Sequence, residues 1–273
     1  MKPSICVTAI LLGLYSLFLA YGPRPSTLSM QSQWQDNNQI VEAYFRKEMH
    51  APVVFVGSSL SRRLRFDDPA CAYNMALGGD SSLTGLAAIL RSSHLPKKVF
   101  IEINVPDRPA NTGLVETADS FYKKLAPIFY TENMPVNLLY SFLAAPHKKD
   151  LNQQISEPLR LEGVALQLKD YGNLIPEDDL RAEIAFFSTA INALEKRGIE
   201  VVLYELPISR ELRETPKERQ IKTAFSEQFP RNKLITARDM GIDVASTDGL
   251  HMSENEAREV STWLRQSYAS ACP

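Results

Sequence analysis

The chain has 273 residues, of which 44% are hydrophobic and 23% are charged, and its formal net charge at pH 7 is −2. This length suits one sizeable α/β domain, and the composition is that of a globular protein rather than a disordered one. A net charge so close to zero creates no field that would attract nucleic acid, so a nucleic-acid-binding protein is not expected. Only four histidines are present and no CxxC spacing occurs, so we expect neither a metal nor a cofactor.

Residues 1–22 contain a segment that predicts membrane insertion. Lys2 precedes an uncharged run from Ile5 to Tyr21. Its length, about 17 residues, is near the minimum for spanning a bilayer and exceeds most signal-peptide apolar regions. Lys2 favours a cytoplasmic N-terminus, which exports the remaining chain to the periplasm or the extracellular space. We favour an uncleaved anchor, because Phe18 fits poorly two residues before a cleavage site at Ala20. A cleaved signal peptide and a buried core helix are the alternatives.

The remaining chain divides into a polar linker at residues 23–38 and a predicted domain at residues 39–273. Short apolar runs predict five strands, which cover Pro52–Val56, Cys71–Met75, Lys98–Ile103, Glu200–Leu206 and Lys233–Thr236. Helical patterns cover Gln39–His50, Ser82–Ser92, Glu177–Arg197, Arg210–Gln228 and Glu254–Tyr268. Strands that alternate with helices pair in parallel through crossover connections. This predicts an α/β fold with three α/β/α layers and a mostly parallel five-stranded sheet.

One stretch, at about residues 105–176, interrupts the alternation. It contains amphipathic fragments at Ala118–Leu125 and Val136–Leu143 mixed with prolines, which predicts a largely helical insertion after the third strand. Loops that follow the carboxyl ends of parallel strands surround the ligand crevice. The insertion is therefore either a lid or specificity element, or surface decoration.

The cysteines lie at Cys6, Cys71 and Cys272. Cys6 falls in the apolar N-terminal run, which leaves the other two as the only pair that can form within the domain. An oxidising compartment permits that disulfide, although a single pair is no disulfide framework. The sequence leaves the pairing open.

The segment Val53–Leu60, VVFVGSSL, carries a candidate nucleophile. A predicted strand runs directly into a glycine and two serines, followed by a helical turn. A serine at such a junction stands at the top of the sheet, near the positive end of a helix dipole. There a base can take its proton and its oxygen can attack an acyl carbon. Taken alone, the pattern is more typical of a helix N-cap.

A candidate base lies near the C-terminus, in the segment Asp248-Gly249-Leu250-His251. Two residues separate the acid from the histidine on a tight turn, so the carboxylate can hold the imidazole in one tautomer. This is the base half of a catalytic triad. Taken alone, a capping aspartate and a surface histidine explain the segment more simply.

Together the two segments resemble the SGNH/GDSL hydrolase superfamily. In that family the nucleophile lies in a Gly-Asp-Ser-Leu-like block, and both triad partners lie in one late block. Here the first block is FVGSSL, with Ser59 at the nucleophile position and Ser58 where aspartate is usual. Asp248 and His251 match the late block. The resemblance implies a triad of Ser59, His251 and Asp248 on a flavodoxin-like SGNH fold.

Asn74–Leu86, NMALGGDSSLTGL, resembles the family's second block and places Gly79 at an oxyanion-donor position. A glycine lets the backbone approach a developing oxyanion and present its amide, although a simple turn is the structural alternative. The third block departs from the family's Gly-x-Asn-Asp, because the strand ends in IEINVPD. Aligning Asp107 with the family aspartate puts Pro106, which has no donor, at the asparagine position. Asn104 is the candidate replacement for the second oxyanion donor.

The resemblance implies an extracytoplasmic serine esterase or O-acyltransferase, with acetyl esters of cell-surface carbohydrate as the expected substrate. Ser59 attacks the ester carbonyl, His251 accepts its proton, and the amides of Ser59 and Gly79 bind the oxyanion. The expected partners are the acylated substrate, the membrane and an envelope polysaccharide machinery. The alternative is a non-catalytic scaffold or binding subunit of such a machinery, to which the altered GSS block points. Glu102, in an apolar strand, is explained as well by a structural carboxylate as by catalysis.

Overall fold

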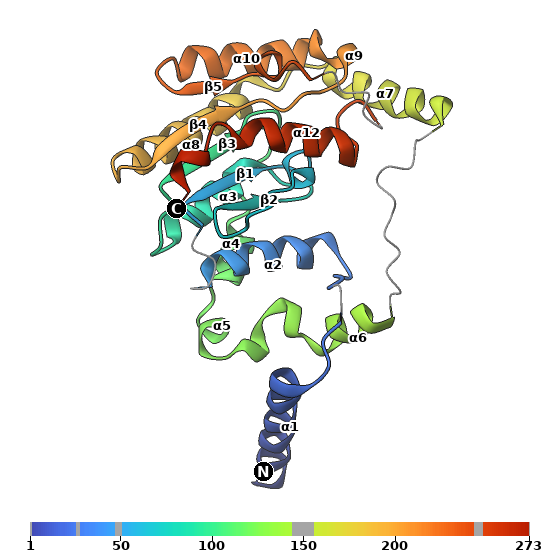
Figure 1. Ribbon diagram of the computed structural model, residues 1–273, viewed down its shortest axis with the longest axis vertical. Coiled ribbons are helices and arrows are strands. Elements are labelled where there is room, and N and C mark those ends of the chain that lie inside the picture. The colour runs from blue at the N-terminus through green and yellow to red at the C-terminus, as the bar shows by residue number, and fades with distance from the viewer. Residues whose placement is uncertain (1, 26–27, 47–50, 144–155, 243–247, 273) are drawn as a thin grey trace.

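The computed structural model describes residues 2–25, 28–46, 51–143, 156–242 and 248–272. At its centre lies a five-stranded, all-parallel sheet with the strand order β2-β1-β3-β4-β5 (Figure 1). The strands are β1 (Val53–Gly57), β2 (Ala72–Ala76), β3 (Lys98–Glu102), β4 (Glu200–Tyr204) and β5 (Lys233–Ile235). All five lie where the apolar runs predicted them, and the predicted α/β fold is confirmed.

Helices make up much of the remaining described chain. The α-helices are α1 (Lys2–Tyr21), α2 (Gln33–Phe45), α3 (Ser82–Arg91), α4 (Thr112–Ala118), α5 (Phe121–Leu125), α6 (Pro135–Leu143), α7 (Glu157–Tyr171), α8 (Glu177–Glu195), α9 (Arg210–Arg213), α10 (Pro216–Gln228), α11 (Ala237–Met240) and α12 (Glu254–Arg265). The 3-10 turns are η1 (Ser61–Arg63), η2 (Pro127–Phe129), η3 (Thr131–Asn133) and η4 (Ala269–Ala271).

Alternate side chains of the strands enter two cores, one on each face of the sheet. Val54, Val99 and Val201 enter the larger core, which α2, α3, α4, α8 and α10 cover. Phe55 and Phe100 stack with ring centroids 4.4 Å apart in the other core, which α12 covers. Because β1 and β3 are covered on both faces, every residue in them is buried. The layers are therefore α/β/α.

The helix that follows α1 in the chain, α2, begins earlier than predicted. The sequence indicated a helix at Gln39–His50, whereas α2 starts at Gln33. The Ser32 side chain caps it by accepting a hydrogen bond from the Gln35 amide at 3.3 Å. The polar linker is correspondingly shorter than 23–38, and the predicted end of the helix lies outside the described residues.

The helix predicted at Arg210–Gln228 is two helices. α9 ends at Arg213, and α10 begins at Pro216. Proline has no amide hydrogen to continue a helix, but it fits the first turn of a new one. α9 lies close to the turn at Gly249, whose carbonyl accepts the amide hydrogen of Ser209, the residue before α9, at 2.9 Å.

In its described part the insertion is largely helical, as predicted, and it divides into two portions. α4 and η3 pack on α2, while α5 contacts η2 and α6 contacts η3 (Figure 1). α7 lies instead against α9 and α10, on the other side of the domain. Residues 144–155, between these portions, lie outside the described residues.

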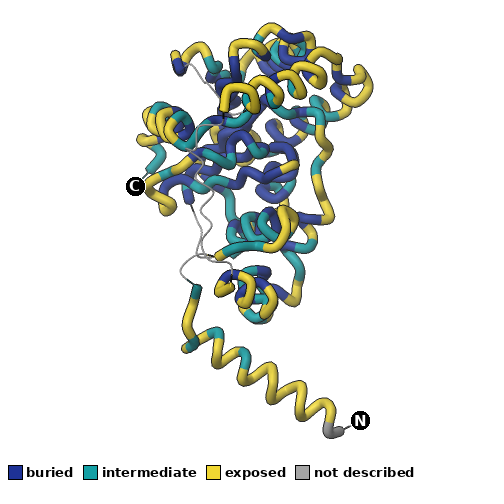
Figure 2. Tube along the Cα trace, turned by 90° about the vertical axis from the view of Figure 1, so that its right-hand side faces the viewer, coloured by how far each residue is buried: buried dark blue, intermediate teal, exposed yellow. Residues whose placement is uncertain are grey.

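α1 stands apart from the sheet domain and is exposed along its length (Figure 2). Its residues Ser4–Tyr21 have a mean hydropathy of 2.0, so the helix is long and apolar enough to span a membrane. Hydrogen bonds join α1 and the residues directly after it to the insertion. The Tyr15 hydroxyl donates to the Asn133 carbonyl, and the Arg24 guanidinium donates to Asn133 Oδ1 at 2.9 Å.

Cys71 and Cys272 form a disulfide, with their Cα atoms 5.3 Å apart. Cys71 directly precedes β2, the edge strand, and Cys272 follows α12. The bridge joins residues 201 positions apart, so it ties the C-terminal segment to the start of the sheet. The pairing that the sequence left open is therefore formed.

Cys272→Ser should lower the free energy of unfolding by about 2–5 kcal/mol, because the unfolded chain regains the freedom that a long closed loop had lost. Urea unfolding of the full chain in detergent, followed by tryptophan fluorescence, measures the change. The matched control is Cys6→Ser, because Cys6 is free and exposed. Equal unfolding midpoints for the two variants would contradict a stabilising role for the bridge.

Candidate active site

β1 delivers Ser59 to the carboxyl edge of the sheet through a tight turn, residues 57–61, here called the serine elbow. The strand ends at Gly57, and the chain turns through the two serines into η1. A Cβ atom at residue 57 would collide with the Ser61 side chain and the Glu102 carboxylate, so only glycine fits there. The elbow leaves Ser59 half-buried at the junction that the sequence block predicted.

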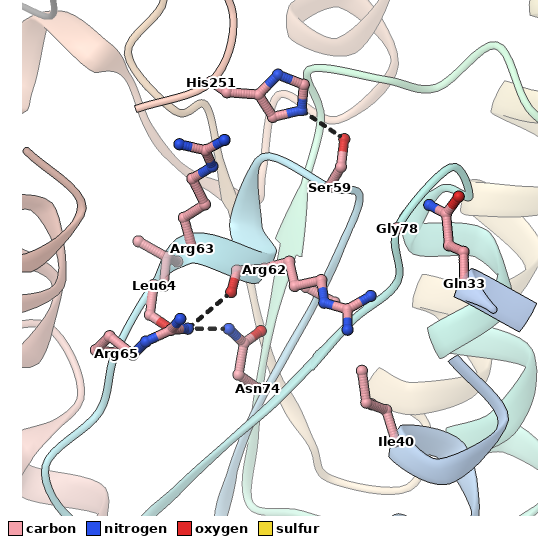
Figure 3. Close-up of a pocket in the computed structure, with 11 residues that line it drawn as sticks. Gln33, Ile40, Ser59, Arg62, Arg63, Leu64, Arg65, Asn74, Gly78 and His251 are labelled. Carbon is pink, nitrogen blue, oxygen red and sulfur yellow. Dashed lines mark hydrogen bonds between the residues drawn. The ribbon is translucent and has the colours of Figure 1, made fainter. Parts of the chain in front are cut away.

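Ser59 and His251 lie 192 residues apart in the sequence and meet over this edge of the sheet (Figure 3). Ser59 Oγ lies 3.0 Å from His251 Nε2, and His251 Nδ1 lies 2.7 Å from Asp248 Oδ2. An ionised carboxylate can only accept hydrogen bonds, so Nδ1 carries a proton, which leaves Nε2 as the acceptor for the Ser59 hydroxyl whenever the ring is neutral. The structure thus brings together the three residues predicted as a triad, in the order nucleophile, base and orienting acid.

Asp248 holds the base with both of its oxygens. While Oδ2 binds the imidazole, Oδ1 accepts the amide hydrogens of Leu250 at 3.0 Å and His251 at 2.8 Å. Gly249 permits this turn with a φ of +89°. Burial alone raises the pKa of Asp248, but the hydrogen bonds from the His251 ring and backbone outweigh it and lower the pKa to about 2. The carboxylate is therefore ionised at neutral pH.

Ser58, the neighbouring serine, points into the protein. It is 1% exposed, and its hydroxyl donates to Glu102 Oε1 at 2.6 Å. Glu102 also accepts the amide hydrogens of Ser58 at 2.9 Å and of Ser61 at 3.2 Å, together with the Ser61 hydroxyl. Of the two serines in the block, Ser59 faces the base and Ser58 supports the elbow.

Glu102 is a site residue whose role the sequence left undecided. The β1–β3 register pairs Val56 with Ile101, so Glu102 lies next to the end of β1. Burial raises the pKa of Glu102, and the hydrogen bonds from the two serines oppose that rise. Its contacts are those of a structural anchor for the serine elbow. The signal available in the sequence was an acidic residue closing an otherwise apolar strand.

A pocket of about 640 Å³ opens beside the triad (Figure 3). Its walls come from α2, the serine elbow and its continuation, β2, the turn after β2, and residues 248–251, here called the histidine turn. The lining residues are Gln33, Ile40, Ser59, Arg62, Arg63, Leu64, Arg65, Asn74, Ala76, Gly78 and His251. Within the described part of the chain, this lining includes no residue of 105–176, so the contacts do not support a lid role for the insertion at this pocket.

Three arginines give the pocket a cationic wall, which the sequence reasoning did not anticipate. Arg62 pairs with Asp36 of α2, and Arg63 donates to the Met252 carbonyl next to the base. Arg65 donates to the Arg62 carbonyl at 3.0 Å. These bonds hold the guanidinium groups in place. A wall of this kind suits carboxylate, phosphate or sulfate groups on a bound molecule.

The turn after β2 carries Gly79, the predicted oxyanion donor. Gly79 has a left-handed backbone with a φ of +69°. Asn37 of α2 accepts the Gly78 amide hydrogen at 3.0 Å and donates to the Gly78 carbonyl at 2.8 Å, which fixes the turn beside the pocket. Asn37 was not foreseen, because the predicted helix began only at Gln39. The donor role of the Gly79 amide stays a prediction.

Asn104 is not placed as an oxyanion donor. Its Nδ2 donates to the Leu206 carbonyl at 3.0 Å, and its Oδ1 accepts the Leu206 amide hydrogen at 2.7 Å. The residue is 1% exposed and is not part of the pocket lining. It bridges the segments that follow β3 and β4, and these contacts do not place it at the oxyanion site. Asp107, aligned with the family aspartate, instead pairs with Lys217 at 2.6 Å.

Asp248→Asn should change how the free energy of unfolding depends on pH in the acid range. A carboxyl with a pKa of about 2 in the folded state and about 3.9 when unfolded adds stability that is complete above pH ~5 and disappears as the pH falls toward 2. We expect the unmodified chain to be the more stable of the two near neutral pH, and the difference to close between about pH 5 and pH 2. Urea unfolding across this range measures it. A difference that does not change with pH would contradict the lowered pKa.

No family model matches the chain, and searches of curated proteins and of solved structures find no match either. The resemblance to the SGNH/GDSL superfamily therefore rests on the sequence blocks, and the chemistry is inferred from the residues of this chain.

Proposed function

We propose that this chain is an extracytoplasmic serine esterase or O-acyltransferase for acyl esters, with acetyl esters of cell-surface carbohydrate as the substrate class. The observation that carries the proposal is the hydrogen-bonded series from Ser59 through His251 to Asp248, with separations of 3.0 and 2.7 Å. A hydroxyl bound to a neutral, oriented imidazole is activated for attack on an acyl carbon. The adjoining pocket offers room for the ester.

The reaction follows from this arrangement. Ser59 Oγ attacks the ester carbonyl carbon while His251 Nε2 accepts the hydroxyl proton, and the amides of Ser59 and Gly79 donate to the oxyanion. His251 then protonates the departing alkoxide, which leaves as an alcohol. The acyl group remains on Ser59 as an ester. A water molecule or a sugar hydroxyl, deprotonated by His251, attacks this acyl ester. As the bond to Ser59 breaks, His251 gives the proton that it took to Ser59 Oγ. The products are a carboxylic acid or a newly acylated sugar, together with the free enzyme.

The substrate class draws on two further features. α1 is long and apolar enough to span a membrane, which supports an enzyme held at the cell surface. The arginines that line the pocket support an ester carried on an acidic carbohydrate, since guanidinium groups bind carboxylates and other oxyanions. The carbohydrate itself is implied by the family resemblance.

A fluorophosphonate probe should label the full chain, and Ser59→Ala should abolish labelling, because the probe reacts only with an activated hydroxyl. The matched control is Ser58→Ala, which removes a neighbouring hydroxyl that faces Glu102 and should retain labelling. Circular dichroism establishes that both variants are folded. Labelling that survives Ser59→Ala but not Ser58→Ala would reverse the assignment.

The chain should release p-nitrophenol from p-nitrophenyl acetate, and Ser59→Ala should reduce kcat/KM by at least about 10³-fold. Adding uronic-acid and neutral oligosaccharides separates the two reactions. Acetylated oligosaccharide detected by mass spectrometry identifies a transferase, and acetate alone identifies an esterase. We expect an uronic-acid oligosaccharide to compete with the ester better than a neutral one. Equal effects of the two would contradict the role given to the arginines.

A non-catalytic scaffold is the second candidate function, and the position of Asn104 is the observation that favours it. Its side-chain amide bonds to Leu206 and the residue is 1% exposed, which does not place this asparagine as the second oxyanion donor. Removing one such donor lowers the rate of related chemistry by roughly 10²–10³. Folded protein that neither reacts with the fluorophosphonate nor releases p-nitrophenol would favour the scaffold.

A further inference from the structure

The insertion carries a large apolar surface beside α1. Its members are the exposed aromatic and aliphatic side chains of α5, η2 and α6, here called the insertion face: Phe121, Tyr122, Leu125, Phe129, Val136, Leu139, Tyr140, Phe142 and Leu143. The exposed fractions reach 74% at Phe121 and 73% at Leu143. A soluble domain rarely leaves so many large apolar side chains together in water.

The polar side of the same segment is turned inward. Glu42 of α2 and Lys123 of α5 form an ion pair in which both side chains are almost completely buried. Glu42 also accepts the Thr131 amide hydrogen at 2.9 Å and the Thr131 hydroxyl at 2.6 Å. Asn137, fully buried in α6, donates to the Thr131 carbonyl at 2.7 Å. Apart from Leu138, which is buried in α6, the segment therefore turns these polar groups toward the domain and presents most of its large apolar groups outward. This is the reverse of the usual order in water.

The insertion is held against the C-terminal half of α1. Asn133 accepts hydrogen bonds from Tyr15 and from Arg24, which follows the helix. The chain beyond the helix is held as well, because the Ser29 amide donates to Ser141 Oγ at 2.9 Å. At 1.5 Å per residue, Tyr15 lies about 9 Å along the helix from Tyr21. When α1 spans a bilayer up to Tyr21, the segment bonded to Tyr15 must reach the level of the headgroups and upper acyl chains.

We propose that the insertion face lies in the interface of the bilayer that α1 spans. Aromatic and aliphatic side chains of this kind occupy the headgroup region, and interfacial helices bury their apolar side about 5–10 Å deep. The continuity of the face with α1 selects lipid as the occupant. The inference rests on the membrane anchoring in the proposed function and not on the serine chemistry. Its consequence is that the domain is held at the membrane surface in one orientation.

The test places a fluorescent label at matched exposed leucines of the full chain. In a Cys6→Ser background with the disulfide intact, NBD is attached at Leu125→Cys, Leu139→Cys or Leu143→Cys, and the protein is reconstituted in phosphatidylcholine nanodiscs. The control is Leu166→Cys on α7, which is 67% exposed, compared with 63%, 58% and 73% at the three test positions. Lipids that carry a nitroxide should quench the three insertion labels several-fold more than the control label and shift their emission to the blue.

A label at Leu11→Cys within α1 separates failure of the inference from failure of anchoring. Strong quenching at Leu11 with insertion labels no more quenched than Leu166 would overturn the inference while leaving the anchor in place. No quenching at Leu11 would overturn both. Insertion labels shielded from aqueous iodide but not quenched by lipid nitroxide would show that protein covers the face, which also overturns the proposal.

Discussion

The carboxylate of Glu102, buried where two parallel strands end side by side, holds the turn that carries Ser59. It binds the serines on both sides of Ser59, so the backbone of the elbow cannot shift without breaking several hydrogen bonds in a buried network. Tyr204, the partner of Glu102 on β4, adds a hydrogen bond of 2.6 Å to Ser61 Oγ. The ends of β1, β3 and β4 thus support the turn that carries the Ser59 hydroxyl.

His251 is linked to the serine elbow by more than its hydrogen bond with Ser59. Arg63 lies in η1, directly after the elbow, and donates to the carbonyl of Met252, which follows the histidine. Asp248 fixes the other side of the same turn through two backbone amides. Ser59 and His251 are therefore held in place by the protein itself. In the proposed mechanism both are oriented before substrate binds, which is the condition under which hydrogen bonds lower a reaction barrier most.

The sequence predicted what depends on local pattern and missed what depends on distant partners. The strands were predicted from short apolar runs. The three residues that meet at Ser59 were predicted from two short sequence blocks and their resemblance to a known family. Asn104 looked available because its partner, the backbone of Leu206, lies 102 positions away. Asn37 was assigned to a linker for the same reason, since its role depends on the turn at Gly78. The buried polar groups of the insertion could not be predicted either, because Glu42 pairs with Lys123, which lies 81 positions later in the chain.

The disulfide between Cys71 and Cys272 has a consequence for when the protein matures. The histidine turn is followed directly by α12, whose far end the bridge fastens to the edge of the sheet. Thiols remain reduced in the cytoplasm and oxidise after export. In the proposed topology, a newly made chain therefore crosses the membrane before the disulfide between Cys71 and Cys272 has formed. In that topology the chain completes its structure only after it has left the cytoplasm.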